Sequence, residues 1–195
     1  MNKLSVAPYI EKYYPEYWGK TYSYPVNQCA TFGKVDEDWG ILGNFGRTPI
    51  KIKDVTFKNV EQLFQMAKFR EKEILKELYE AGGGQGVKMK QKKYTPIPEW
   101  GEYFIDFLKF CLVQKYEQSE DFRKELERSK GLYIVEKQAS KKKQCEAYCM
   151  QLKDDNYVGY NLMGQLLMEL RDKGTLEYHL PDNALDFVDI LKEEL

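Results

Sequence analysis

Three polar side chains between residues 61 and 68 have the types and the spacing that could do chemistry. Glu61, Gln65 and Lys68 place a carboxylate, an amide and an amine at positions i, i+4 and i+7. On a helix, which turns about 100° per residue, this spacing stacks the three side chains along one edge. Such a row could form the wall of an active site, and it could equally be a solvated edge holding an ordinary ion pair. Spacing alone leaves both interpretations open.

The helix that must position this row is expected over residues 60–81. Asn59 is a suitable N-cap, and Gly82 is suited to the left-handed conformation that ends a helix. The polar row lies beside an apolar stripe made of Val60, Leu63, Phe64, Ala67, Ile74 and Leu78. The glycine run at residues 82–86 is interpreted as a C-cap followed by a loop, because phosphate-binding glycine loops follow a strand and open a helix.

The rest of the chain predicts an α+β fold, a mainly helical single domain with a small, mostly antiparallel sheet. We expect irregular structure over the first thirty residues, a hairpin at 49–57, helices at 101–118, 120–129, 162–173 and 183–194, and strands at 131–136 and 147–152. Asn161 is expected to cap the helix that ends at Gly174. Residues 1–29 are assigned to an aromatic-rich N-terminal extension and residues 30–195 to the domain, including its C-terminal helix.

Composition narrows the classes of function. The formal net charge is −1, so binding to nucleic acid would have to rest on local clusters of lysine, at residues 88–93 and 137–143. No stretch approaches the ~20 apolar residues that span a bilayer. The four cysteines are too few and too scattered for a disulfide framework, which favours free thiols and a cytoplasmic protein. With a single histidine, His179, we expect no metal site and no cofactor.

Four motifs in order resemble the NADAR family. They are WGILGNF at 39–45, KNVEQLFQMAK at 58–68, FLKFCLVQKYEQS at 107–119 after Trp100, and VGYNLMGQLLMELR at 158–171. Each motif alone is weak evidence, but their order and gaps match over roughly residues 30–174. The resemblance therefore implies a NADAR-like fold and a ligand that contains ribose.

The family resemblance implies a hydrolase that cleaves the N-glycosidic bond between ribose C1′ and a nucleobase amine. The substrate favoured here is guanine carrying ADP-ribose in DNA or RNA, with no membrane partner. One alternative keeps the reaction and changes the substrate to phosphoribosylated intermediates of riboflavin biosynthesis. Another is a non-catalytic module that binds ADP-ribose or a nucleotide. In both reactions positive charge develops on the sugar, and a carboxylate would stabilise it or activate water.

By resemblance, Glu61 matches the motif glutamate and Lys68 the motif lysine, which would be a nucleophile or a clamp on the sugar. The other expected ligand contacts are hydrogen bonds from Asn44 and Gln65, stacking by Trp39, Phe45 and Trp100, and phosphate binding by Arg47 and by the helix start at Asn161 and Gly164.

One segment departs from the family pattern. Where many members carry Asp-x-x-Trp-Gly, this chain has Tyr148 and Cys149 in place of Trp-Gly, and Glu146 is the nearest acid. Tyr148 keeps a ring for stacking, while Glu146 or Glu136 could replace the aspartate. If neither does, the protein would bind its ligand and turn it over poorly. The neighbouring Lys141–Lys143 run is either a solvated loop or a contact to phosphates.

Overall fold

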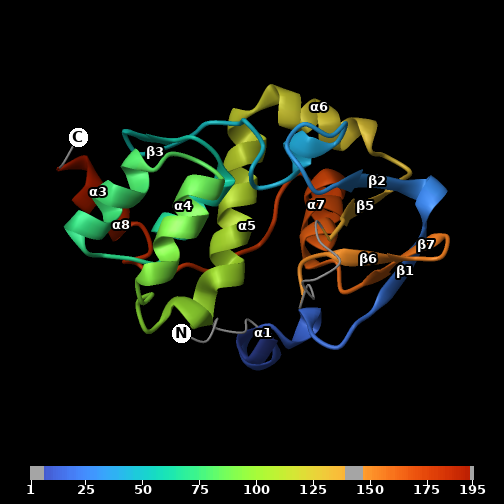
Figure 1. The fold of residues 1–195 in the computed structure, drawn as a ribbon, viewed down its shortest axis with the longest axis horizontal. Helices are drawn as coiled ribbons and strands as arrows, with labels where there is room; N and C mark the ends of the chain where they lie inside the picture. Colours follow the sequence, from blue (N-terminus) through green and yellow to red (C-terminus); the bar gives the residue numbers. More distant parts are fainter. Residues whose placement is uncertain (1–6, 139–146, 194–195) are drawn as a thin grey trace. The chain divides into compact units, whose positions relative to one another are not determined.

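The computed structural model describes residues 7–138 and 147–193 (Figure 1). The chain forms two compact units, each made of two segments. The first unit contains Met1–Gly43 and Arg123–Leu176, and the second contains Asn44–Phe122 and Glu177–Leu195. The two units are described separately below.

The first unit is built on two small sheets. Strands β1 (Tyr22–Pro25), β7 (Asn156–Gly159) and β6 (Met150–Lys153) form an antiparallel sheet in the order β1-β7-β6. Strands β2 (Cys29–Phe32) and β5 (Tyr133–Glu136) form a parallel pair. Helix α7 (Leu162–Lys173) packs against β5. This approach requires Gly164, because a Cβ there would lie 2.1 Å from the carbonyl oxygen of Ile134.

Residues 7–30 contain a helix, 3₁₀ turns and strands, so the expectation of irregular structure is wrong for this part of the first thirty residues. Helix α1 (Ala7–Tyr13) and a short 3₁₀ turn (Pro15–Tyr17) precede β1, which pairs with β7 so that Tyr24 lies opposite Tyr157. Both tyrosines are buried in a small core with Val135 and Met150. Because this core is assembled from distant segments, no local pattern in the first thirty residues reveals it.

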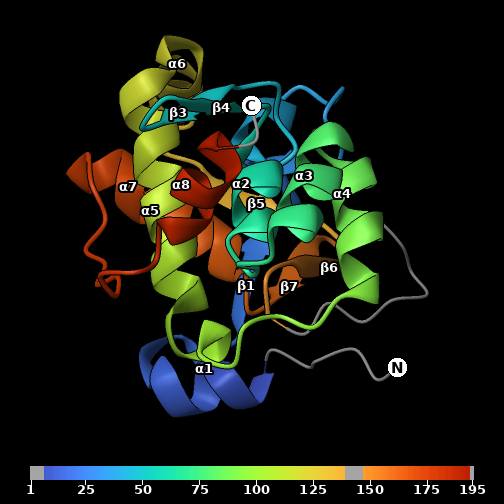
Figure 2. The same cartoon turned by 90° about the vertical axis from the view of Figure 1, so that its left-hand side faces the viewer.

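The second unit is mainly helical. Its elements are the hairpin β3 (Ile50–Ile52) and β4 (Val55–Phe57), and the helices α2 (Val60–Met66), α3 (Lys72–Glu80), α4 (Gln85–Lys90), α5 (Trp100–Gln118) and α8 (Asp186–Lys192). Helix α2 contacts α3, α4 and α5, and Figure 2 shows α3 and α4 beside it. Phe57, Phe107 and Phe187 pack against one another in the core. The hairpin confirms the predicted turn at Lys53, which has a φ of +52°.

The helix predicted over residues 60–81 is in fact two helices. Backbone carbonyl groups between the two helices accept hydrogen bonds from donors other than the i+4 amides of an α-helix. The Arg70 guanidinium donates to the oxygens of Ala67 and Phe69, each at 2.9 Å, and the Ile97 amide donates to Lys68 at 2.9 Å. The break resets the helical phase, so Leu75 is fully buried in α3 while Ile74, a member of the predicted stripe, is only partly buried.

The glycine run also differs from its prediction. Gly82 adopts the expected left-handed conformation, with a φ of +74°, where α3 ends. Gly84, with a φ of +76°, then directly precedes α4. The run therefore does open a helix, and α4 was not predicted. The residues of α4 are mostly lysine, glutamine and glycine, which give little apolar periodicity to recognise.

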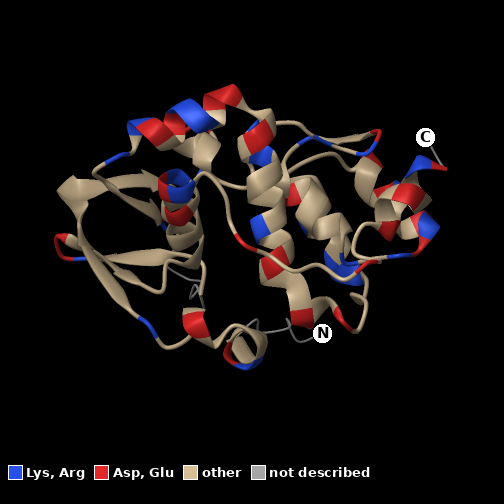
Figure 3. Ribbon diagram, turned by 180° about the vertical axis from the view of Figure 1, so that it is seen from behind, with Lys and Arg blue, Asp and Glu red and all other residues tan. Residues whose placement is uncertain are grey.

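Other sequence predictions can now be compared with the structure. The α+β class with mostly antiparallel pairing is confirmed, and so are α5, the strand at 133–136 and helix α6 (Glu120–Arg128), along which both signs of charge alternate (Figure 3). Cys29 and Cys111 are free thiols, whereas Cys149 is disulfide-bonded, which corrects the expectation for that residue. No helix among the described residues is long and apolar enough to cross a membrane.

Candidate functional site

The start of α2 is held rigidly by its own polar residues. The Asn59 side chain accepts a hydrogen bond from the Gln62 amide at 3.0 Å, which is the predicted N-cap. The Gln62 side chain in turn accepts from the Lys58 amide at 2.7 Å and donates to the Tyr79 carbonyl at 3.0 Å. The Glu61 amide donates to the Asn44 carbonyl at 2.9 Å. These contacts fix where the next side chains along α2 point.

Glu61, Gln65 and Lys68 form one hydrogen-bonded chain, here called the α2 network. Gln65 Nε2 donates to Glu61 Oε1 at 2.9 Å, and Lys68 Nζ donates to Gln65 Oε1 at 2.6 Å. Glu61 and Gln65 are only 4% and 7% exposed. A solvated edge would leave these groups open to water, so the interpretation of the row as a solvated edge is wrong.

The ammonium group of Lys68 lies in a largely desolvated position. Burial lowers its pKa to about 8, the nearby Glu61 carboxylate opposes this shift, and the charge of Lys88 adds to it. Lys68 Nζ lies 5.6 Å from the ring centroid of Phe64 and 5.9 Å from that of Trp100. A lysine with such a pKa is partly neutral near physiological pH, as a nucleophilic amine must be.

Lys88 joins this site from α4, and the sequence analysis did not place it there. Its Nζ lies 4.0 Å from Glu61 Oε1 and 4.9 Å from the ring centroid of Phe45. Its side chain is 46% exposed, so it links the buried carboxylate to solvent. The lysine cluster at residues 88–93 was the available signal. Recognising the role of Lys88 required knowing that α4 packs against α2.

The remaining predicted site residues of the second unit have different surroundings. Asn44 Oδ1 is buried and accepts no hydrogen bond from the described residues, so it is available to a ligand donor. Phe45 packs near Gly84 and under Lys88. Arg47 is exposed. Trp100 makes edge or tilted contacts with the rings of Phe64, Tyr103 and Phe107, which favours a packing role over stacking on a ligand.

Five of the predicted site residues that the structure describes belong to the first unit, and the structure shows local roles for several of them. They are Trp39, Glu136, Tyr148, Asn161 and Gly164. The guanidinium of Arg128 lies 3.5 Å from the ring centroid of Trp39. Glu136 lies at the end of β5, and Tyr148 is partly buried. The expected acid Glu146 and the Lys141–Lys143 run lie outside the described residues.

Asn161 and the start of α7 are occupied by backbone contacts. Asn161 has a φ of +55° and makes no side-chain cap, which corrects that prediction. Its Nδ2 instead donates to the Ile134 carbonyl at 2.8 Å, and its Oδ1 accepts from the Glu136 amide at 3.3 Å. The amides of Leu162 and Met163 donate to backbone carbonyls at 147 and 148. The start of this helix is expected from the sequence to bind phosphate. These two amides, however, are already hydrogen-bonded and are not open to a phosphate.

Comparison with known proteins identifies the fold. Residues 31–173 match the model of the NADAR domain. The chain belongs to the NADAR family. It is 26% identical over 148 residues to proteins named N-glycosidase YbiA from Shigella boydii serotype 4 and Shigella flexneri serotype 5b, covering 75% of this chain and 88% of each relative.

A solved structure shows the same NADAR fold. The NMR structure of the E. coli protein YbiA aligns with a TM-score of 0.61 and 24% sequence identity, over 80% of this chain and 91% of that one. The α2 network lies inside the matched NADAR segment. Among the described residues, no three His, Cys, Asp or Glu side chains group as a metal site. The groups that the network and Lys88 present are a carboxylate, an amide and two amines.

Proposed function

We propose that this NADAR protein is a hydrolase that cleaves the N-glycosidic bond between ribose C1′ and a nucleobase amine, with ADP-ribosylated guanine in nucleic acid as its substrate. The observation that carries the proposal is the buried α2 network of Glu61, Gln65 and Lys68. The relatives named N-glycosidase support the reaction type.

Glu61 is the group that fits the bond-breaking step. As the C1′–N bond breaks, its electron pair moves to the nitrogen and positive charge develops on the sugar. A carboxylate held by Gln65 would stabilise that charge electrostatically and take a proton from the attacking water. The water oxygen then bonds to C1′, and the proton passes to the departing amine. Every atom of the products comes from the substrate and one water molecule.

Lys68 offers a second route through the same site. When the sugar ring of the substrate opens, C1′ is left as an imine to the base nitrogen. The neutral Lys68 amine adds to C1′, the bond from C1′ to the base nitrogen breaks, and the base leaves as its amine after taking a proton from the lysine nitrogen. Water then hydrolyses the Lys68 imine, which releases the C1′ aldehyde and restores the amine. Because burial lowers the Lys68 pKa to about 8, part of the population carries the neutral amine at neutral pH. Reduction with borohydride during turnover would trap this imine as a stable adduct on Lys68.

The preference for ADP-ribose rests on the cation beside the network. Lys88 lies 4.0 Å from the Glu61 carboxylate on a half-exposed side chain, and further lysines follow it at positions 90, 92 and 93. The negatively charged diphosphate next to the ribose would be attracted to these lysine ammonium groups. Asn44 Oδ1 supplies a buried acceptor for a sugar hydroxyl or a base N–H.

The deciding experiment is incubation with guanine-ADP-ribosylated DNA while the release of free ADP-ribose is followed. Glu61→Gln should lower the rate by about 10²- to 10⁴-fold, whereas Glu80→Gln, at an exposed position in α3, should leave it unchanged. If a phosphoribosylamino-pyrimidine is cleaved instead, the substrate belongs to the riboflavin branch. Binding of ADP-ribose without turnover of either substrate, unaffected by Glu61→Gln, would identify a non-catalytic module.

A further inference from the structure

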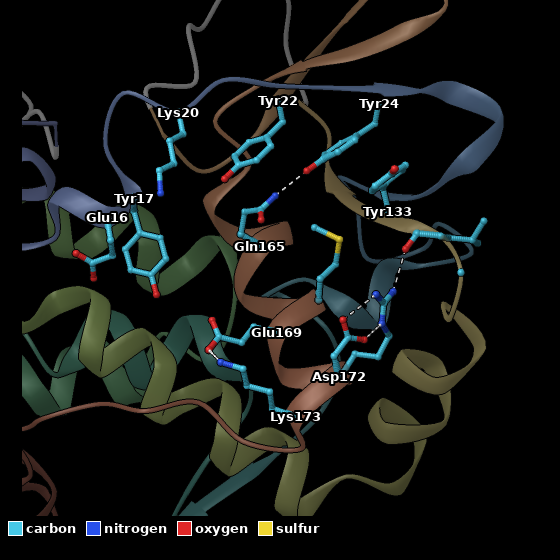
Figure 4. Close-up of a pocket in the computed structure, with 14 residues that line it drawn as sticks. Glu16, Tyr17, Lys20, Tyr22, Tyr24, Tyr133, Gln165, Glu169, Asp172 and Lys173 are labelled. Carbon is cyan, nitrogen blue, oxygen red and sulfur yellow. Dashed lines mark hydrogen bonds and ion pairs between the residues drawn. The ribbon is translucent and has the colours of Figure 1, made fainter.

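A second candidate binding site lies entirely within the first unit. It is an open pocket of about 830 Å³ formed between the segment that leads into β1, the start of β5 and one face of α7 (Figure 4). None of its lining residues belongs to the α2 network. We call it the tyrosine pocket because Tyr17, Tyr22, Tyr24 and Tyr133 all line it.

Three of these rings form a nearly parallel stack. Tyr24 lies 4.1 Å from Tyr133 with an interplanar angle of 13°, and 5.9 Å from Tyr22 with an angle of 19°. Tyr24 is buried, whereas Tyr22 is only partly buried and Tyr133 is 39% exposed. The two outer rings of the stack therefore retain surface on which another flat ring can continue the stack.

Polar groups surround the Tyr22 end of the stack. Gln165 Nε2 donates to the Tyr24 hydroxyl at 2.8 Å, which fixes the amide and leaves Gln165 Oε1 as an acceptor within the pocket. Figure 4 shows Tyr17, Lys20 and Tyr22 gathered at this end, with Gln165 between them and Tyr24. An aromatic surface beside an oriented amide suits a flat ring whose edge carries N–H groups.

Two of the three cations that line the pocket are paired with two of its three carboxylates, and the third carboxylate is Glu16. Lys173 pairs with Glu169 at 2.8 Å, and Arg171 pairs with Asp172 at 2.8 Å. For Lys20, the part of the chain that the structure describes shows no ion-pair partner. A ligand that carries one phosphate near its ring would place that phosphate within reach of the flexible Lys20 side chain.

From these contacts we propose that the tyrosine pocket binds a nucleobase, which stacks on Tyr22, is hydrogen-bonded at its edge by Gln165 Oε1, and has its phosphate near Lys20. Both a free nucleotide and an unpaired base of a single-stranded nucleic acid offer this chemistry. The site goes beyond the proposed hydrolysis, because no step of that reaction uses it. It also depends on residues 16–24, which precede residue 31, where the NADAR match begins.

The test is calorimetric titration with guanosine 5′-monophosphate and, separately, with a short single-stranded oligodeoxynucleotide. Tyr22→Ala should weaken binding about tenfold or more, since stacking of a base on an aromatic ring is worth ~1–3 kcal/mol. Tyr22→Phe keeps the ring and should bind like the wild type. Glu80→Gln, exposed on α3 and outside both sites, should also bind like the wild type. Release of ADP-ribose is measured separately, so failure of the proposed reaction and failure of this site give different results.

A second measurement covers the case in which Tyr22→Ala disturbs β1. The side-chain amide resonances of Gln165, assigned with Gln165→Leu, should shift when the nucleotide is added to the unsubstituted protein. If the mononucleotide and the oligonucleotide both produce these effects, the pocket accepts a free nucleotide. If only the oligonucleotide does, it accepts a base within nucleic acid. An unshifted Gln165 amide with both probes, or full binding by folded Tyr22→Ala, would overturn the proposal.

Discussion

Two lysines in the second unit have lowered pKa values but lie in different surroundings. Lys68, at the end of α2, has a pKa of about 8, and Lys115, on α5, has one of about 7, with burial as the main cause in both. Lys68 donates to Gln65 within a chain that leads to the Glu61 carboxylate. Lys115 is fully buried with its Nζ 4.3 Å from the ring centroid of Phe122.

The difference shows that a lowered lysine pKa does not by itself mark an active site. Desolvation acts on both amines. Lys68 is in addition joined through Gln65 to the Glu61 carboxylate and feels the charge of the half-exposed Lys88. Lys115 should instead affect the stability of the fold, because its buried environment disfavours the charged form of the amine. Substitutions at the two positions should therefore separate activity from stability.

The largest effect is expected from paired substitutions of the two lysines by methionine. Lys68→Met should lower kcat/KM for release of ADP-ribose by about 10²- to 10⁴-fold, whether the amine acts as a nucleophile or holds the sugar. Lys115→Met should retain the activity of the wild type, because the side chain is fully buried and separate from the α2 network. Equal losses of kcat/KM in the two variants would show that the two lysines do not differ in their importance for activity.

Stability should show the opposite order. Burial lowers the Lys115 pKa from its ordinary value of 10.5 to about 7 in the folded protein, so the unfolded chain binds more protons between these two pH values. The free energy of unfolding should therefore fall by about 2 kcal/mol between pH 9 and pH 7. Urea denaturation at several pH values measures this slope. Lys115→Met should remove most of it, and a slope that persists unchanged would assign the dependence to other groups.

Two glutamines on α2 provide a finer comparison. Gln65→Leu breaks the hydrogen bonds to Glu61 and Lys68 and should lower activity about tenfold, the effect of losing a polar contact to charged groups. Gln62→Leu instead removes the contacts that tie α2 to Lys58 and Tyr79, and should lower stability by about 1–2 kcal/mol. Kinetic assays and thermal denaturation of both variants are needed. If Gln62→Leu folds stably but is less active than Gln65→Leu, the roles assigned to the two glutamines are wrong.

The smallest effect is expected at Lys88. Its side chain is half exposed, so Lys88→Gln should raise KM only about three- to fivefold, and the difference from the wild type should shrink as salt is added. Lys92→Gln, an exposed neighbour in the same lysine cluster, is the matched control and should change KM less. A larger effect at Lys92 than at Lys88 would indicate that the phosphates are bound farther from Glu61 than proposed.

The sequence was most informative where a residue acts through its near neighbours. The Asn59 cap, the hairpin turn at Lys53 and the row of Glu61, Gln65 and Lys68 depend on contacts within a few residues, and the structure has all of them. The break at residues 67–71 involves a local partner, the Arg70 guanidinium, and a distant one, the Ile97 amide that donates to the Lys68 carbonyl. No pattern within the helix announces such a distant partner.

The candidate site was predicted only in part for the same reason. Lys88 reaches Glu61 because α4 packs on α2, and α4 has too little apolar periodicity to be predicted. Asn161 looked like a helix cap because its type and position fit one, but its side chain bridges two backbone groups of β5. In both cases a partner far away in sequence decided the outcome.

The glycine run between α3 and α4 has a consequence for how this protein can vary. A Cβ at Gly83 would lie 2.8 Å from Asn59 Nδ2, and one at Gly84 would lie 3.2 Å from the Phe45 ring. A side chain at either position would therefore push on the cap of α2 or on the ring beneath Lys88. In a saturation library selected for activity, this surface loop should be as intolerant of substitution as a buried core.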